Sequence, residues 1–196
     1  MLKLFTLLLT FLVFTSPVSA ATSVKARIPS GIGILKIKKV PVGANSPIVI
    51  YKEPSLGRLA EIEVGSLPPL AQSIASSALS VPVIVSLKKS SWYRIIYDNG
   101  EREGWIEGRS GYQFIKWEDL LINRPVALIS GLRKEFYTLH RDATASSAQI
   151  ESVEKGKLFT PLRVNGDWVL LITDSGAQGW LRWRDDNGRL VISTTL

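Results

Sequence analysis

The chain has 196 residues, of which 45% are hydrophobic and 21% are charged, a composition typical of one or two globular domains. It has no cysteine, which excludes disulfides, thiolate zinc sites and thiol nucleophiles, and its single histidine excludes metal sites built from several histidines. We therefore expect no metal ion and no cofactor. The formal net charge of +7 favours anionic partners, although no nucleic-acid-binding motif accompanies it.

Residues 1–20 have the features of a secretory signal peptide. Lys3 gives a positive start, residues 4–13 form an apolar run, and small residues precede a predicted cleavage after Ala20. The alternative is an uncleaved anchor, but the apolar run is shorter than the ~20 residues that span a bilayer. We expect a periplasmic or secreted protein of the bacterial cell envelope, with no stable membrane span after cleavage.

Residues 21–46 are interpreted as a lead-in that includes an edge strand. Apolar residues alternate with polar ones through residues 32–42, which predicts a strand. The lysines at positions 36, 38 and 39 favour an edge position, because lysine discourages pairing with another chain.

One short pattern then occurs twice, at residues 92–106 and 168–181. Each copy has a strand headed by tryptophan, a turn with aspartate and glycine, and a Gly-Trp pair that opens the next strand. Both copies predict tight hairpins, because glycine tolerates positive φ and aspartate bonds back to the turn backbone. The copies differ in length by one residue, which we place in the turn, where insertions cost least.

The hairpins lie within two longer repeats, residues 47–122 and 123–196. Short strands bounded by turn residues flank both hairpins, a pattern typical of small all-β barrels. The first repeat alone has an insertion, at residues 65–81, with space for one helical turn.

The second repeat closely resembles the bacterial SH3-like (SH3b) domain. The resemblance rests on Gly166 with Trp168, the turn at residues 174–176, Gly179 with Trp180, and the Lys-Gly turn at residues 155–156. The first repeat departs from the family by its insertion, and the second lacks the proline usual in the first loop. The resemblance implies an all-β fold of two tandem small SH3-like β-barrels. It also implies modules that bind cell-wall peptides, glycans or partner proteins rather than catalyse.

Strand alternation predicts which side chains fill each barrel. The expected inward set is Tyr93, Ile95 and Tyr97 in the first repeat and Val169, Leu171 and Thr173 in the second. The opposite face of the second repeat is also apolar, at positions 168, 170 and 172, so we expect the two barrels to pack against each other there. Trp105 and Trp180 are interpreted as core residues.

The remaining aromatic and basic side chains are the candidate ligand-binding residues. Trp183, flanked by Arg182 and Arg184, is the preferred contact surface, because interfaces favour tryptophan and arginine. The full candidate set is Trp92, Arg94, Trp168, Arg182, Trp183 and Arg184.

We predict no catalytic residues. His140 is interpreted as an exposed loop histidine, because no nucleophile-elbow pattern accompanies it. The close carboxylate pairs at residues 101 and 103 and at residues 185 and 186 lie in predicted turns, where solvation accounts for them. A pair of carboxylates with hydrolase spacing is a property of the fold and stays open at this stage.

The predicted function is a non-catalytic exported binding or scaffolding module of the cell envelope that recognises peptidoglycan or an envelope protein. A protein–protein adaptor of the periplasm is the first alternative. A carboxylate-dependent cell-wall hydrolase is the second.

Overall fold

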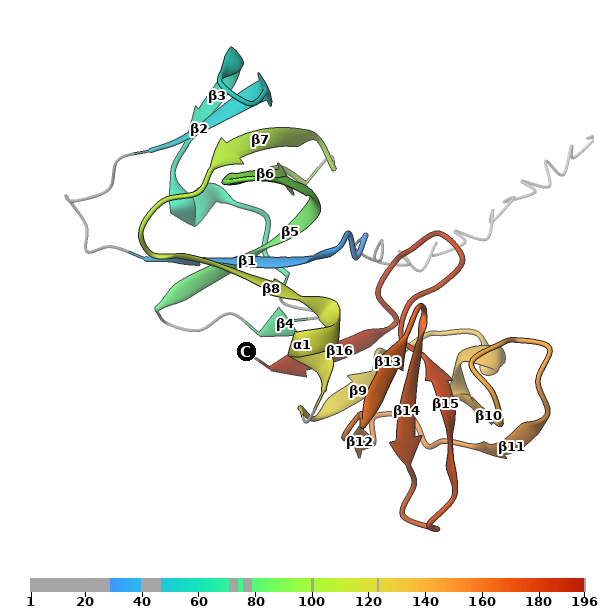
Figure 1. Ribbon diagram of the computed structural model, residues 1–196. Coiled ribbons are helices and arrows are strands. Elements are labelled where there is room, and N and C mark those ends of the chain that lie inside the picture. Colours follow the sequence, from blue (N-terminus) through green and yellow to red (C-terminus); the bar gives the residue numbers. More distant parts are fainter. Residues whose placement is uncertain are drawn as a thin grey trace, which may run out of the picture.

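The computed structural model describes residues 29–39, 47–70, 74–75, 79–99, 101–122 and 124–195 (Figure 1). These residues form mostly β-strand, with α1 (Trp117–Leu121) as the single α-helix among them and two short 3-10 turns, η1 (Val64–Ser66) and η2 (Lys134–Tyr137). The prediction of an all-β chain is therefore confirmed. The predicted signal peptide and its cleavage at Ala20 lie outside the described residues.

The first repeat forms a seven-stranded sheet in the order β3-β2-β7-β6-β5-β1-β8. The strands are β1 (Gly33–Lys38), β2 (Ile48–Glu53), β3 (Leu56–Ile62), β5 (Ser80–Lys89), β6 (Trp92–Ile96), β7 (Glu103–Glu107) and β8 (Tyr112–Lys116). The long strand β5 pairs with β1 through residues 80–85 and with β6 through residues 85–89. One strand thus joins both parts of the sheet around a core that includes Leu35, Ile50 and Val85, all fully buried.

The second repeat has two smaller sheets. The five-stranded sheet runs β11 (Gln149–Ser152), β10 (Thr138–His140), β15 (Gln178–Arg182), β14 (Trp168–Ile172) and β13 (Arg163–Asn165). The four-stranded sheet runs β12 (Leu158–Phe159), β9 (Val126–Leu128), β16 (Ile192–Thr195) and β4 (Ile74–Ala75). Strand pairing among the described residues closes no barrel, so the sheets are open where closed barrels were expected.

The two predicted hairpins are present and share one register. In β6–β7, Trp92 lies opposite Glu107 and Ile95 opposite Gly104. In β14–β15, Trp168 lies opposite Arg182, with the same offsets along the hairpin. The longer turn, residues 97–102 against 173–177, takes up the one-residue difference as predicted.

The prediction that residues 32–42 include an edge strand is wrong. Strand β1 lies between β5 and β8 and pairs with both. Its place matches that of β9, which pairs with β12 and β16 in the second repeat, so β1 is an integral strand of the first repeat. Ile34, Leu35 and Ile37 are all fully buried. Because neighbouring residues point to opposite faces of a strand, both faces of β1 are covered at residues 34 and 35.

The two repeats share a hydrophobic core, but the predicted contact face is wrong. Trp117 and Leu121 of α1 pack in one cluster with Phe136, Val169 and other residues of the second repeat. Strand β4, from the insertion of the first repeat, pairs in parallel with β16 at the end of the second. The predicted face of β14 takes no part in this cluster, and its Ile172 is 51% exposed.

Candidate ligand-binding groove

Two tryptophans meet where the repeats join. The rings of Trp117 and Trp183 lie 5.5 Å apart, and both side chains are buried. The Trp117 indole Nε1 donates to the Ser30 carbonyl at 2.6 Å, and the Trp183 Nε1 donates to the Gly166 carbonyl at 2.8 Å. Because each indole has a hydrogen-bond partner, burial leaves neither N–H unsatisfied.

Two further contacts tie the repeats together beside these rings. The backbone N and the Oγ of Ser30 both donate to the Gly188 carbonyl, at 2.8 and 2.7 Å. The Arg189 guanidinium donates from two nitrogens to the two Glu101 carboxylate oxygens, at 3.0 and 3.2 Å. The turn of the first hairpin is thereby fixed to the last loop of the second repeat.

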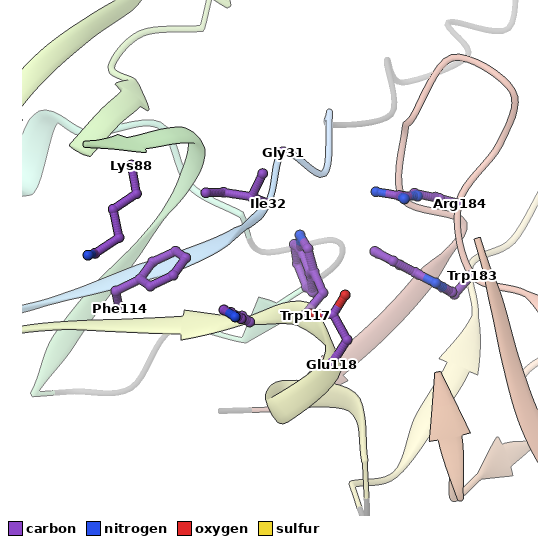
Figure 2. Close-up of a pocket in the computed structure, with 9 residues that line it drawn as sticks. Gly31, Ile32, Lys88, Phe114, Trp117, Glu118, Trp183 and Arg184 are labelled. Atoms are coloured by element: carbon purple, nitrogen blue, oxygen red, sulfur yellow. The ribbon is translucent and has the colours of Figure 1, made fainter. Parts of the chain in front are cut away.

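An open groove of about 450 Å³ lies at this junction (Figure 2). Its size falls within the range of small-molecule sites, roughly 300–1,000 Å³. The two buried tryptophans form part of its wall, together with the half-buried Phe114 and the exposed Ile32. The full lining is Gly31, Ile32, Lys88, Phe114, Lys116, Trp117, Glu118, Trp183 and Arg184.

The groove carries an excess of positive charge. Three cationic side chains, Lys88, Lys116 and Arg184, line it against one carboxylate, Glu118. Arg184 lies 4.8 Å from the centroid of the Trp183 ring and forms an ion pair with Asp167. Among the described residues, the ammonium groups of the two lysines form no ion pair, so they remain available to an anionic ligand.

The structure separates the predicted contact residues from one another. Trp183, the preferred contact residue, is 1% exposed and is therefore chiefly a core residue, which corrects the prediction. Only its neighbour Arg184 joins it at the groove. Trp168 is also buried, at 8% exposure. Two of the tryptophans predicted to contact a ligand at the surface are therefore buried.

Arg182 is held inside the second repeat. Its Cζ lies 5.6 Å from the Trp168 ring and 5.8 Å from the Phe136 ring. One of its terminal nitrogens donates to Asp186 at 2.7 Å, and this hydrogen bond and charge lower the pKa of the Asp186 carboxyl.

Trp92 and Arg94 lie on β6 of the first repeat and do not line the groove, although both are neighbours of Tyr93, which pairs with the groove residue Lys88. Trp92 is half-buried, and Arg94 is exposed and paired with Glu103 at 2.9 Å. Of the two tryptophans expected in the core, Trp105 is buried and Trp180 is only half-buried.

His140 is not an exposed loop residue. It ends β10, is 6% exposed, and packs edge-on against Trp168 with ring centroids 5.2 Å apart. Asp185 is likewise buried, and its carboxylate oxygen Oδ1 accepts hydrogen bonds from the backbone N–H groups of residues 187 and 189. The prediction for His140 is wrong because its polar sequence neighbours hide the end of a buried strand. The solvated carboxylate predicted at Asp185 is wrong because this side chain bonds back to the backbone of its own turn.

Most residues of the groove were missed by sequence reasoning. They come from strand β8, helix α1, the end of β5 and the two residues just before β1, which are brought together only by folding. No local spacing links these segments, so no sequence signal was available.

No cluster of three or more histidine or acidic side chains suited to a metal ion occurs in the described part of the chain. Within the same residues, no helix combines the length and the apolar character needed to cross a bilayer. Comparison with models of known protein families gives no match, and comparison with curated proteins gives no significant match.

Proposed function

We propose that this chain is a non-catalytic exported binding or scaffolding module of the cell envelope, built from two SH3-like repeats. Its ligand is peptidoglycan or an envelope protein with anionic groups, held in the groove between the repeats. The shared register of the two hairpins supports the duplication from which the SH3-like interpretation starts.

The groove is the observation that carries the proposal. It joins an apolar aromatic wall to three cations and one carboxylate. Such a surface suits a ligand with an apolar part and carboxylate or phosphate groups, because the cations supply charge-assisted hydrogen bonds. The shared core holds both walls in place, so less ordering is needed on binding.

Retention on insoluble peptidoglycan at low salt tests this proposal. We expect Lys88→Glu with Lys116→Glu to weaken retention by about tenfold, because two cations at the ligand become anions. Lys39→Glu with Lys52→Glu is the matched control, since it makes the same total change in charge at two exposed lysines that do not line the groove. An equal loss of retention in the control variant, or no retention of the wild-type chain, would contradict the peptidoglycan proposal.

The adaptor alternative has one observation in its favour. Strand β3 is an outer strand of the seven-stranded sheet and exposes Leu56 and Leu59 at 69% and 50%. An unpaired strand edge with exposed leucines suits strand addition by a partner. Cross-linking in an envelope fraction, with no retention on peptidoglycan, would favour the adaptor; release of soluble sugars from wall material would instead favour a hydrolase.

A further inference from the structure

Each repeat has an aromatic pair between the first tryptophan of its hairpin and a residue of the neighbouring strand. In the first repeat, the rings of Tyr51 and Trp92 meet edge to face, with centroids 5.4 Å apart and an angle of 86°. In the second, His140 and Trp168 meet in the same way, at 5.2 Å and 70°. The positions are equivalent, because Tyr51 lies opposite Trp105 as His140 lies opposite Trp180. We call each pair an aromatic cradle.

In the second repeat the protein's own cation covers the tryptophan of the cradle. Arg182, the cross-strand neighbour of Trp168, places its guanidinium 5.6 Å from the centroid of the Trp168 ring and 5.8 Å from that of the nearby Phe136 ring. The side chain is only 14% exposed, and its Nε has no hydrogen-bond partner among the described residues. Contact with the ring faces and the ion pair with Asp186 therefore hold this buried cation.

The cradle of the first repeat lacks this internal cation. Glu107 takes the place of Arg182, because it lies opposite Trp92 in the same register. Glu107 is exposed, and Trp92 and Tyr51 are half-buried where Trp168 and His140 are buried. Within the described residues, no arginine or lysine lies over the Trp92 ring.

Two basic residues close to Trp92 in the sheet do not take that place. Lys89 is the other cross-strand neighbour of Trp92, and it is exposed without a contact to the ring. Arg94, two residues along β6, is held by Glu103 at 2.9 Å. The cradle therefore offers an aromatic face with a carboxylate beside it.

We propose that the first cradle binds the guanidinium of an arginine side chain on a partner protein, stacked on Trp92 and paired with Glu107. In the second repeat the equivalent tryptophan, Trp168, already carries a guanidinium on its ring, that of Arg182, which also lies over the Phe136 ring. Arginine suits the site better than lysine, because its planar group stacks on a ring while it donates two parallel hydrogen bonds to a carboxylate. None of the cradle residues lines the groove, so this proposal does not rest on the function proposed above.

The experiment titrates the full chain with acetyl-Gly-Arg-Gly-amide and follows the indole N–H signal of Trp92 by NMR. The signal is assigned with Trp92→Phe. The matched probe is the same peptide with citrulline, which keeps the planar shape of arginine but has no charge and carries a carbonyl oxygen in place of one terminal nitrogen. We expect saturable binding of the arginine peptide in the millimolar range and binding of the citrulline peptide at least about tenfold weaker.

Glu107→Arg is the most informative variant, because it places an arginine opposite Trp92, as Arg182 lies opposite Trp168 in the second repeat. We expect its new guanidinium to cover Trp92, to shift the indole signal without any peptide, and to abolish peptide binding. Glu154→Arg makes the same charge change at an exposed residue outside the cradle and should bind as the unchanged chain does. If Glu107→Arg does not fold, Glu107→Gln replaces it and should weaken binding several-fold.

Three results would overturn the proposal: equal binding of the citrulline peptide, undiminished binding by the folded Glu107 variant, or no shift of the Trp92 signal at saturating peptide. The lysine variants of the groove test the proposed function alone, so their loss of peptidoglycan retention would not affect the binding of the arginine peptide.

Discussion

Two glycines show how single residues set the packing of each repeat. Gly104 and Gly179 precede the second tryptophan of each hairpin, and a side chain of the neighbouring strand lies close to both. A Cβ on Gly104 would clash with the Ile50 side chain, and one on Gly179 would lie 2.6 Å from the Leu139 side chain. The repeated Gly-Trp pair is thus a packing requirement shared by both repeats.

We expect Gly179→Ala to destabilise the chain by about 1–3 kcal/mol, because the added methyl overpacks a fully buried site against Leu139. Chemical denaturation measures the change. Gly65→Ala is the control, since its Cβ would meet nothing within 4 Å, and it should be close to neutral. Equal effects of the two substitutions would contradict the packing explanation.

At the scale of elements, the hairpins and their turns were predictable and the neighbours of each strand were not. The turn of the first hairpin carries Glu101, a non-glycine residue at a φ of 60°, and this residue pairs with Arg189 of the other repeat. A conformation that costs energy locally is thus accompanied by a contact between repeats.

A double-mutant cycle on Glu101→Gln and Arg189→Gln measures that contact. We expect a coupling free energy of roughly 0.2–1 kcal/mol, because both side chains are partly exposed, and we expect it to shrink in high salt. The cycle separates this pair from the other interactions of Arg189. A coupling of zero at low salt would show that the ion pair does not help to fix the hairpin turn.

At the scale of the whole molecule, the two repeats share one core. The buried cluster runs from Ile34 and Trp117 in the first repeat to Leu181 and Val191 in the second. Because each repeat buries apolar surface against the other, we expect them to unfold together.

Trp117→Phe tests this coupling, since it removes the hydrogen bond to Ser30 and part of the contact with Trp183. We expect a loss of about 1–3 kcal/mol in the free energy of unfolding, with one transition seen by both fluorescence and circular dichroism. Leu59→Ala, at an exposed position, should change little. Two separate transitions, only one of them shifted, would show that the repeats unfold independently.

The sequence by itself determined the β class and both hairpins, including the glycines of their turns. It also determined that Ile95, Val169 and Leu171 point inward, and all three are fully buried. These features depend on turn chemistry and on the two-residue period of a strand, which are local. Only the tertiary structure decided that β1 lies inside its sheet, that Trp183 and His140 are buried, and that the groove lies between the repeats. Each of these depends on which distant segment packs against a residue, and the residue's own neighbours in the sequence do not specify that contact.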